Sequence, residues 1–234
     1  MKKIEEIRIA GSTDGDRVAT MGMNFGYLFL KYMGDYHMNK EINIVVIQIT
    51  KKDIGCKKYE ILLNDVNTYN LYFIYTRISM SYYGSLNNFD KLIFVCEVIY
   101  KSILEWAEKY DLPIEPINVA YKKIKDEEYF LEKKKKYTSR NKKYTCGLEY
   151  RNELEFRTYR LVVSSNETNE IKKYFITEKT YTDYRHLMEI DPINWFTYPG
   201  ELKAKGWVNN EEFEMYWGDE EKYIFNIKKE KLND

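Results

Sequence analysis

Few side chains in this sequence have the types and spacing that chemistry requires. His37 and His186 are the only histidines, which removes most schemes that pair a nucleophile with histidine and most polyhistidine metal sites. The pattern Asp183-x-x-His186-x-x-Glu189 could place three metal ligands near one helical face. With one imidazole and no nearby cysteine, we expect the solvated side of a short helix instead.

A second candidate for chemistry is the segment Gly11-Ser12-Thr13-Asp14-Gly15-Asp16, which follows an expected strand. It has the context of a phosphate-binding turn, but it lacks the glycine spacing of such turns, and its aspartates would repel phosphate. Asp14 and Asp16 could bind a divalent cation, although the spacing of a calcium-binding loop is absent. We expect a capped turn. The sequence therefore predicts no catalytic residue, no metal and no cofactor.

The strongest local charge feature is a basic segment in the middle of the chain. It consists of Lys133, Lys134, Lys135, Lys136, Arg140, Lys142 and Lys143. Tyr137 and Tyr144 are interleaved with it, as in proteins that bind single-stranded nucleic acid. The whole chain, however, has 37 basic and 37 acidic residues, whereas nucleic-acid affinity usually rests on a basic surplus. We expect a solvated loop over residues 133–143, with nucleic-acid contact as the alternative.

Aromatic residues gather between positions 195 and 217, next to several acidic ones. The candidate partner-binding set is Trp195, Phe196, Tyr198, Trp207, Glu211, Glu212 and Glu214. Trp and Tyr are frequent anchors of protein–protein contacts, and nearby acids could steer a basic partner. The alternative is that these aromatics form the core of a strand-rich second half. A role in the core explains residues 195–198 less well, because they lie between Pro192 and Pro199 in an expected loop.

The composition favours a cytoplasmic protein. Cys56, Cys96 and Cys146 are an odd number of cysteines at wide spacing, which is neither a disulfide framework nor a metal motif. The N-terminus lacks the apolar run of a secretory signal, and no apolar stretch is long enough to span a membrane.

One long amphipathic helix is expected over residues 88–110. Its apolar residues recur at spacings of three and four, with Ile99 and Ile103 at the centre of the stripe. Asn88 is a suitable N-cap, and Pro113 ends the helix. We expect this helix to pack across an antiparallel sheet.

The first half otherwise reads as strands, with one ambiguous segment. Strands are expected at 3–10, 42–50, 59–63 and 69–75, and the apolar run at 42–50 is typical of a central strand covered on both faces. Residues 14–36 fit either a helix or a strand, and we favour a helix. Gly22 and Gly26 weaken that interpretation, but their spacing would also allow close approach to a neighbouring element.

Pro113 and Pro116 mark a change of composition and the expected boundary between two lobes. Beyond it we expect a strand at 118–124, a short helix at 126–136 and another at 182–190. Hairpins are expected at 144–150 with 154–163 and at 213–217 with 223–227, a strand at 172–178, and a frayed tail at 228–234.

The sequence thus predicts an α+β fold, mostly antiparallel sheet, with one long helix and a second half rich in β-hairpins. The domains would be 1–117 and 118–234, or one continuous domain 1–234. This composition is typical of toxin-immunity proteins and phage-encoded inhibitors. We therefore expect a non-catalytic protein that binds and inhibits another protein and contacts no membrane. The alternatives are a nucleic-acid-associated protein and an enzyme whose site cannot be read from the sequence.

Overall fold

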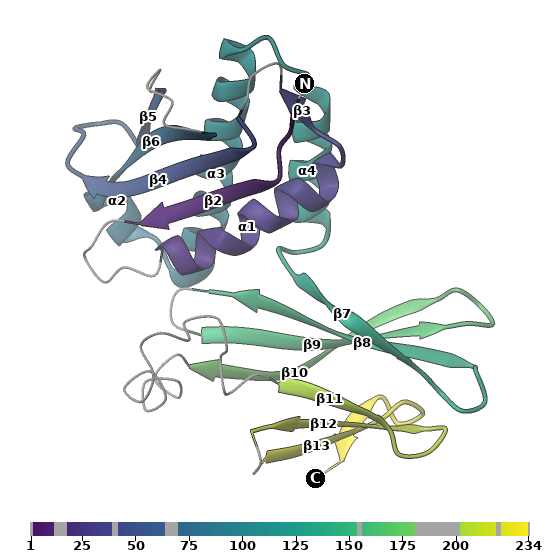
Figure 1. Ribbon diagram of the computed structural model, residues 1–234. Helices are drawn as coiled ribbons and strands as arrows, with labels where there is room; N and C mark the ends of the chain where they lie inside the picture. Colours follow the sequence, from purple (N-terminus) through teal and green to yellow (C-terminus); the bar gives the residue numbers. More distant parts are fainter. Residues whose placement is uncertain are drawn as a thin grey trace. The chain divides into compact units, whose positions relative to one another are not determined.

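The computed structural model describes residues 2–11, 18–38, 42–63, 70–153, 156–180, 202–218 and 221–233. The chain divides into two compact units (Figure 1): unit 1 is Met1–Tyr129 with Asn152–Leu154, and unit 2 is Phe130–Arg151 with Glu155–Asp234. The expected α+β class is confirmed. The division falls beyond residues 113–117, because the helix that begins there belongs to unit 1.

Unit 1 contains a four-stranded sheet in the order β2-β4-β6-β5. Its strands are β2 (Glu6–Gly11), β4 (Ile44–Lys52), β6 (Leu71–Ser79) and β5 (Tyr59–Leu63). Strand β4 is central, as predicted. The β2–β4 and β4–β6 pairs are parallel and only the β5–β6 pair is antiparallel, so this sheet is mixed where we expected an antiparallel one. The physical reason is a helix between β2 and β4, which forms a βαβ crossover. Strands β1 (Lys2–Lys3) and β3 (His37–Met38) form a separate short pair.

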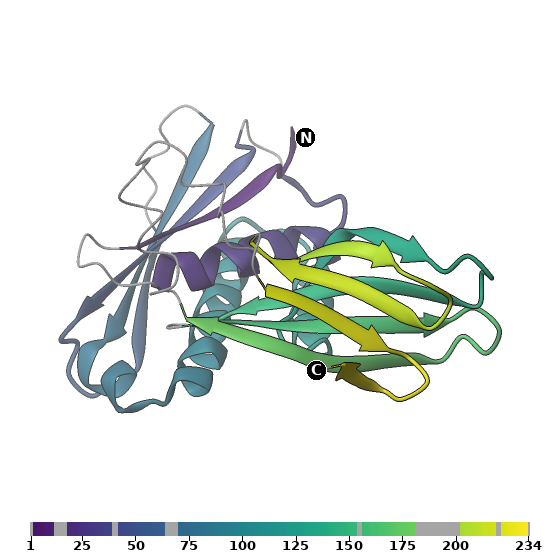
Figure 2. The same cartoon turned by 90° about the horizontal axis from the view of Figure 1, so that it is seen from below.

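Four helices are described in unit 1, and α1 and α3 pack against the four-stranded sheet (Figure 2). They are α1 (Val18–Met33), α2 (Met80–Ser85), α3 (Asn88–Lys109) and α4 (Glu115–Asp126). The helix favoured for residues 14–36 is confirmed as α1, and the long helix as α3. The N-cap of α3 is Asn87 and not Asn88, because the Asn87 side chain accepts a 2.8 Å hydrogen bond from the Asp90 amide.

The strand expected at 118–124 is wrong, since these residues lie in α4. Ile117, Ala120 and Ile124 are its buried residues, and their spacings of three and four match a helical face. Pro116 sits in the first turn, where a missing N–H costs nothing.

Two glycines bring α1 close to β2. A Cβ on Gly26 would lie 2.1 Å from the carbonyl oxygen of Ile7, and one on Gly22 would lie 2.6 Å from Cγ2 of Ile9. Neither position has room for a side chain. The close approach that the glycine spacing allowed is therefore the arrangement found.

Unit 2 is a sandwich of two four-stranded sheets (Figure 2). One sheet has the order β10-β9-β8-β7, with strands β7 (Leu131–Thr138), β8 (Tyr144–Asn152), β9 (Phe156–Ser165) and β10 (Ile171–Thr180). The other has the order β11-β12-β13-β14, with strands β11 (Leu202–Trp207), β12 (Glu212–Trp217), β13 (Glu221–Asn226) and β14 (Lys231–Asn233). Side chains from both sheets, including Leu148, Tyr159, Phe213 and Phe225, form one buried core.

Both expected hairpins and the strand at 172–178 are confirmed in unit 2. The helix expected at 126–136 is wrong, because residues 127–129 form a turn and β7 follows. The tail expected to be frayed contains β14, which pairs with β13. The helix expected at 182–190 lies outside the described residues.

Candidate functional site

A pocket of about 230 Å³ opens in unit 2 beside β7 and β11. These are edge strands of the two different sheets, and they contact each other. The described residues that line the pocket are Lys133, Lys135, Tyr137, Leu148, Lys203, Ala204 and Tyr216. Three of them are lysines and none is a carboxylate. We call this site the basic pocket.

Irregularities in both edge strands shape the pocket. The pairing of β7 with β8 jumps from Glu132–Glu149 to Lys136–Gly147, so residues 133–135 bulge opposite Leu148 alone. Such bulges change the direction in which side chains point. Strand β11 has its own irregularity between Ala204 and Gly206. The two bulges explain how lysines from separate sheets reach one cavity.

Hydrogen bonds from β7 side chains hold the two edges together. The Lys133 Nζ donates to the Leu202 carbonyl oxygen at 2.8 Å, and the Tyr137 hydroxyl donates to the Ala204 carbonyl oxygen at 2.8 Å. In return, Nε1 of Trp207 donates to the Tyr137 carbonyl oxygen at 2.9 Å. These bonds satisfy backbone groups that an edge strand would otherwise leave open, and they give the pocket a fixed wall.

Glycine is required at one point of this wall. Gly206 has a φ of +124°, and a Cβ there would lie 3.2 Å from Cδ1 of Tyr137. Only glycine adopts this backbone conformation readily. The residue therefore lets β11 pass beside the Tyr137 ring.

Lys135 and Lys203 line the basic pocket without a countercharge. No ion pair joins either ammonium group to another described residue, and Lys135 lies over the Tyr137 ring at 4.8 Å. Neighbouring lysines differ: Lys136 pairs with Glu132 at 2.7 Å, and Lys205 pairs with Glu214 at 3.0 Å. The half-buried Tyr216 has no hydroxyl hydrogen bond to another described residue. The pocket thus offers unpaired donors.

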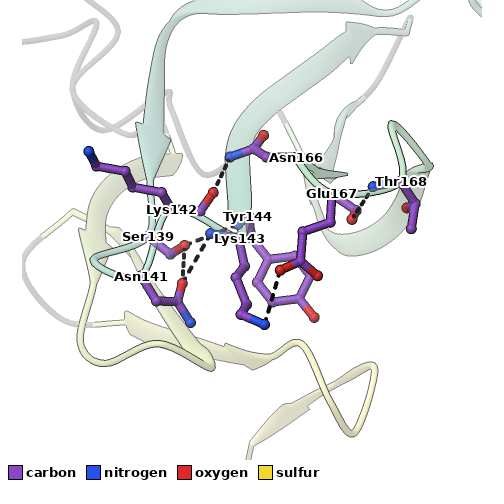
Figure 3. A network of polar contacts seen from close by, with 9 residues as sticks. Ser139, Asn141, Lys142, Lys143, Tyr144, Asn166, Glu167 and Thr168 are labelled. Atoms are coloured by element: carbon purple, nitrogen blue, oxygen red, sulfur yellow. Dashed lines mark hydrogen bonds and ion pairs between the residues drawn. The ribbon is translucent and has the colours of Figure 1, made fainter.

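The rest of the basic segment is arranged differently from the solvated loop we expected. Its first part is strand β7, and the turn that follows is held by a polar network (Figure 3). The Tyr144 amide donates to Ser139 Oγ at 3.0 Å, the Lys143 amide donates to Asn141 Oδ1 at 3.1 Å, and Asn166 Nδ2 donates to the Lys142 carbonyl oxygen at 2.8 Å. These local hydrogen bonds make an ordered turn that the charge pattern alone did not reveal.

Only two of the seven predicted basic residues, Lys133 and Lys135, line the pocket. Lys136 and Lys143 are paired, the latter with Glu167 at 3.0 Å. The others, Lys134, Arg140 and Lys142, do not line the pocket and are exposed, as Lys135 also is.

The interleaved tyrosines pack within unit 2. Tyr137 contacts Phe213 edge-on, with ring centroids 5.6 Å apart, and Tyr144 stacks on Trp207 at 6.4 Å. Both rings are part of the packing of the sandwich, which is their structural explanation.

The predicted partner-binding residues that are described lie on the β11–β12 hairpin. Trp207 is partly buried and packs edge-on against Phe213 at 5.5 Å. Glu211 pairs with Lys228, and Glu212 accepts a 2.8 Å hydrogen bond from Asn209. These contacts tie the side chains to their own unit.

Glu214 completes this hairpin. The hydrogen bond from Lys205, with a further contribution from Lys222, holds the pKa of its carboxyl below the usual value. Trp195, Phe196 and Tyr198 lie outside the described residues, so their role stays a prediction.

The remaining candidates for metal binding or catalysis do not form a site in the described part of the chain. There, no three His, Cys, Asp or Glu side chains come close enough to hold a metal ion. Asp14, Asp16 and the 183–189 pattern lie outside the described residues. Burial raises the pKa of the Cys146 thiol to about 12 and also raises that of Cys96. No helix among the described elements is both long and apolar enough to cross a membrane.

Sequence reasoning missed Lys203 and Tyr216. They lie far along the chain from Lys133, on β11 and β12, and they join the pocket because the edge of their sheet packs against β7. No local motif marks them.

No protein-family model matches this sequence, and no curated protein or solved structure is significantly similar to it.

Proposed function

We propose that this protein is a non-catalytic binding protein that takes an acidic group of a protein partner into the basic pocket of unit 2. The observation that carries the proposal is the pair of uncompensated ammonium groups, Lys135 and Lys203, on the pocket wall. An unpaired charge beside an apolar wall gains more from an incoming anion than a charge that is already paired. The consequence we propose for the partner is that it is blocked or neutralised.

The distribution of charge supports a protein partner over nucleic acid. A nucleic-acid site tracks the phosphate backbone with many unpaired cations and stacking aromatics. Here Lys136 and Lys143 are neutralised by glutamates, and Tyr137 and Tyr144 are packed in the sandwich. What remains is a local site for one side-chain-sized group.

The state of the two buried thiols, Cys96 and Cys146, argues against either of them as a catalytic nucleophile. A cysteine nucleophile needs a lowered pKa and access to substrate. Cys146 is fully buried, and burial raises the pKa of its thiol to about 12, which is the opposite arrangement.

The test is the binding of a fluorescent Asp/Glu-rich peptide to the full chain, followed by anisotropy at low salt. The double variant Lys135→Gln/Lys203→Gln should weaken binding by about tenfold or more. The matched control Lys134→Gln/Lys173→Gln removes the same charge from exposed lysines of unit 2 and should have little effect. Equal losses in both variants, or no binding of the parent, would overturn the proposal. Stronger binding of single-stranded DNA, with a steep salt dependence, would show that the partner is a nucleic acid and not a protein.

A further inference from the structure

We infer that the basic pocket recognises a phosphate monoester, so that the acidic group it takes is a phosphorylated side chain and not a carboxylate. This inference rests on the proposed function. It adds the chemical class of the group that enters the pocket, which the binding of an acidic peptide alone does not define.

The first argument is charge. Lys135 and Lys203 bring to one cavity two ammonium groups that form no ion pair with another described residue, and no carboxylate lies among its described lining residues. A phosphate monoester carries about −1.5 to −2 charges at neutral pH and three acceptor oxygens. A carboxylate has one charge and two oxygens, and would leave more of the positive charge uncompensated.

The second argument is the shape of the donors. Lysine acts as a point charge with rotatable donors, so several lysines can approach one anion from different directions. The described lining has three lysines and no arginine. Tyr216 adds a hydroxyl that bonds to no other described residue. Separate donors from several directions suit a tetrahedral group.

The third argument is the size and lining of the cavity. Its volume of about 230 Å³ is below the roughly 300–1,000 Å³ of typical small-molecule sites, so it suits one functional group and not a whole cofactor. Leu148 and Ala204 supply an apolar wall for the carbon atoms that carry the phosphate. The Leu202 and Ala204 carbonyl oxygens already accept hydrogen bonds from Lys133 and Tyr137, which reduces their repulsion of an anion.

A phosphodiester of a nucleic-acid backbone fits these observations less well. It carries a single charge and has only two unesterified oxygens, so it resembles a carboxylate in what it offers to the three lysines. The inference therefore commits to a monoester on a protein side chain.

The experiment is a titration of the ¹⁵N-labelled full chain, followed by amide chemical shifts of Ala204, Gly206 and Tyr216. The probes are O-phosphoserine, O-phosphotyrosine, inorganic phosphate and N-acetylglutamate. We expect one of the phospho-amino acids to bind about tenfold more tightly than N-acetylglutamate. Its affinity should fall as pH is lowered from 7.5 to 5.5, because the ester takes up its second proton near pH 6. The affinity for N-acetylglutamate should stay nearly constant over this range.

Variants assign the effect to the pocket. Tyr216→Phe should reduce the preference for phosphate over carboxylate, and Lys203→Gln should weaken phosphate binding severalfold. Lys134→Gln, which changes an exposed lysine of β7 outside the pocket lining, should do neither.

The outcomes separate the two proposals. Equal affinities for phospho-amino acid and N-acetylglutamate would overturn the phosphate inference and leave the proposed function standing. No shift with any probe, together with no binding of the acidic peptide, would overturn both. If inorganic phosphate binds as tightly as either phospho-amino acid, the pocket is a site for the free ion. Tighter binding of a 5′-phosphorylated trinucleotide would assign the pocket to nucleic-acid ends. Either result would also overturn the inference.

Discussion

The ammonium group of Lys133 donates a 2.8 Å hydrogen bond to the carbonyl oxygen of Leu202 and so joins the edges of two sheets. Lys133 is partly buried, whereas the next residue, Lys134, is exposed. One lysine of the basic segment is therefore structural, and its neighbour is not.

We predict that Lys133→Met destabilises unit 2, because the carbonyl of Leu202 loses a charged donor. A hydrogen bond to a charged group contributes about 1.5–3 kcal/mol. The free energy of unfolding, followed in urea by tryptophan fluorescence, to which Trp207 and Trp217 of unit 2 contribute beside Trp106 of unit 1, should fall by about that amount. Lys134→Met is the control and should change it by less than about 0.5 kcal/mol. Equal effects would show that the Lys133 bond adds nothing to stability.

We predict that Gly26→Ala strongly destabilises unit 1. The new Cβ would lie 2.1 Å from the carbonyl oxygen of Ile7, so α1 must move away from β2. Overpacking of this kind costs about 1–3 kcal/mol, occasionally more. Ellipticity at 222 nm in urea reports on unit 1, because all described helices belong to it.

The control for Gly26→Ala is Gly84→Ala in α2, where a Cβ would meet nothing within 4 Å. This change should be neutral or stabilise unit 1 by up to about 1 kcal/mol, since alanine restricts the unfolded chain. A Gly26→Ala variant as stable as the parent would contradict the close packing of α1 on β2.

Some elements of the fold could be predicted from the sequence and others could not. Local periodicity was sufficient for α3 and for the hairpins of unit 2, because their apolar spacing is set by the element itself. Local periodicity was not used for α4, where Ile117, Ala120 and Ile124 have helical spacing but a strand was expected at 118–124. The nearly continuous apolar run of β4 predicted its central position, but an antiparallel sheet was expected and its pairs with β2 and β6 are parallel.

Only part of the candidate site could be predicted from the sequence. Lys133 and Lys135 stood out as part of a charge run, but a charge run does not indicate which lysines are paired. Lys203 and Tyr216 reach the pocket through pairing between distant segments, and such pairing leaves no local signal. The bulge at residues 133–135 likewise depends on the register with β8.

We predict that Ile99→Ala destabilises unit 1 by about 2–5 kcal/mol, the usual cost of truncating a large buried aliphatic side chain. Ile99 is fully buried on α3. The control is Val119→Ala on α4, whose side chain is 42% exposed, and it should cost well under 1 kcal/mol. The check is the urea midpoint at 222 nm. Similar midpoints for the two variants would mean that α3 is not the core helix of this unit.

We predict that unit 2 loses stability in acid partly through Glu214. The hydrogen bond from Lys205 lowers the pKa of this carboxyl in the folded state. The stabilisation is therefore fully present above the unfolded value of about 4.3 and is lost as pH falls through the lower folded value. Urea unfolding between pH 6 and pH 3 should show a shallower decline for Glu214→Gln than for the parent.

Lys205→Gln should also flatten this decline, since it removes the donor, whereas Lys134→Gln should leave it unchanged. An identical pH profile for the parent and Glu214→Gln would show that the ion pair does not contribute to acid sensitivity.

We predict that the folded chain has one reactive thiol out of three. Cys56 is exposed, whereas Cys96 and Cys146 are buried. Burial raises the pKa of the Cys146 thiol to about 12 and also raises that of Cys96. The thiolate is the reactive form, so both buried groups are protected by protonation and by lack of access.

At pH 8, a disulfide reagent such as DTNB should release one equivalent of chromophore rapidly. Two more equivalents should appear only on opening or unfolding. Cys56→Ser should abolish the rapid phase and leave the slow one. Rapid release of two or three equivalents from the folded parent would contradict the burial of these cysteines in the two cores.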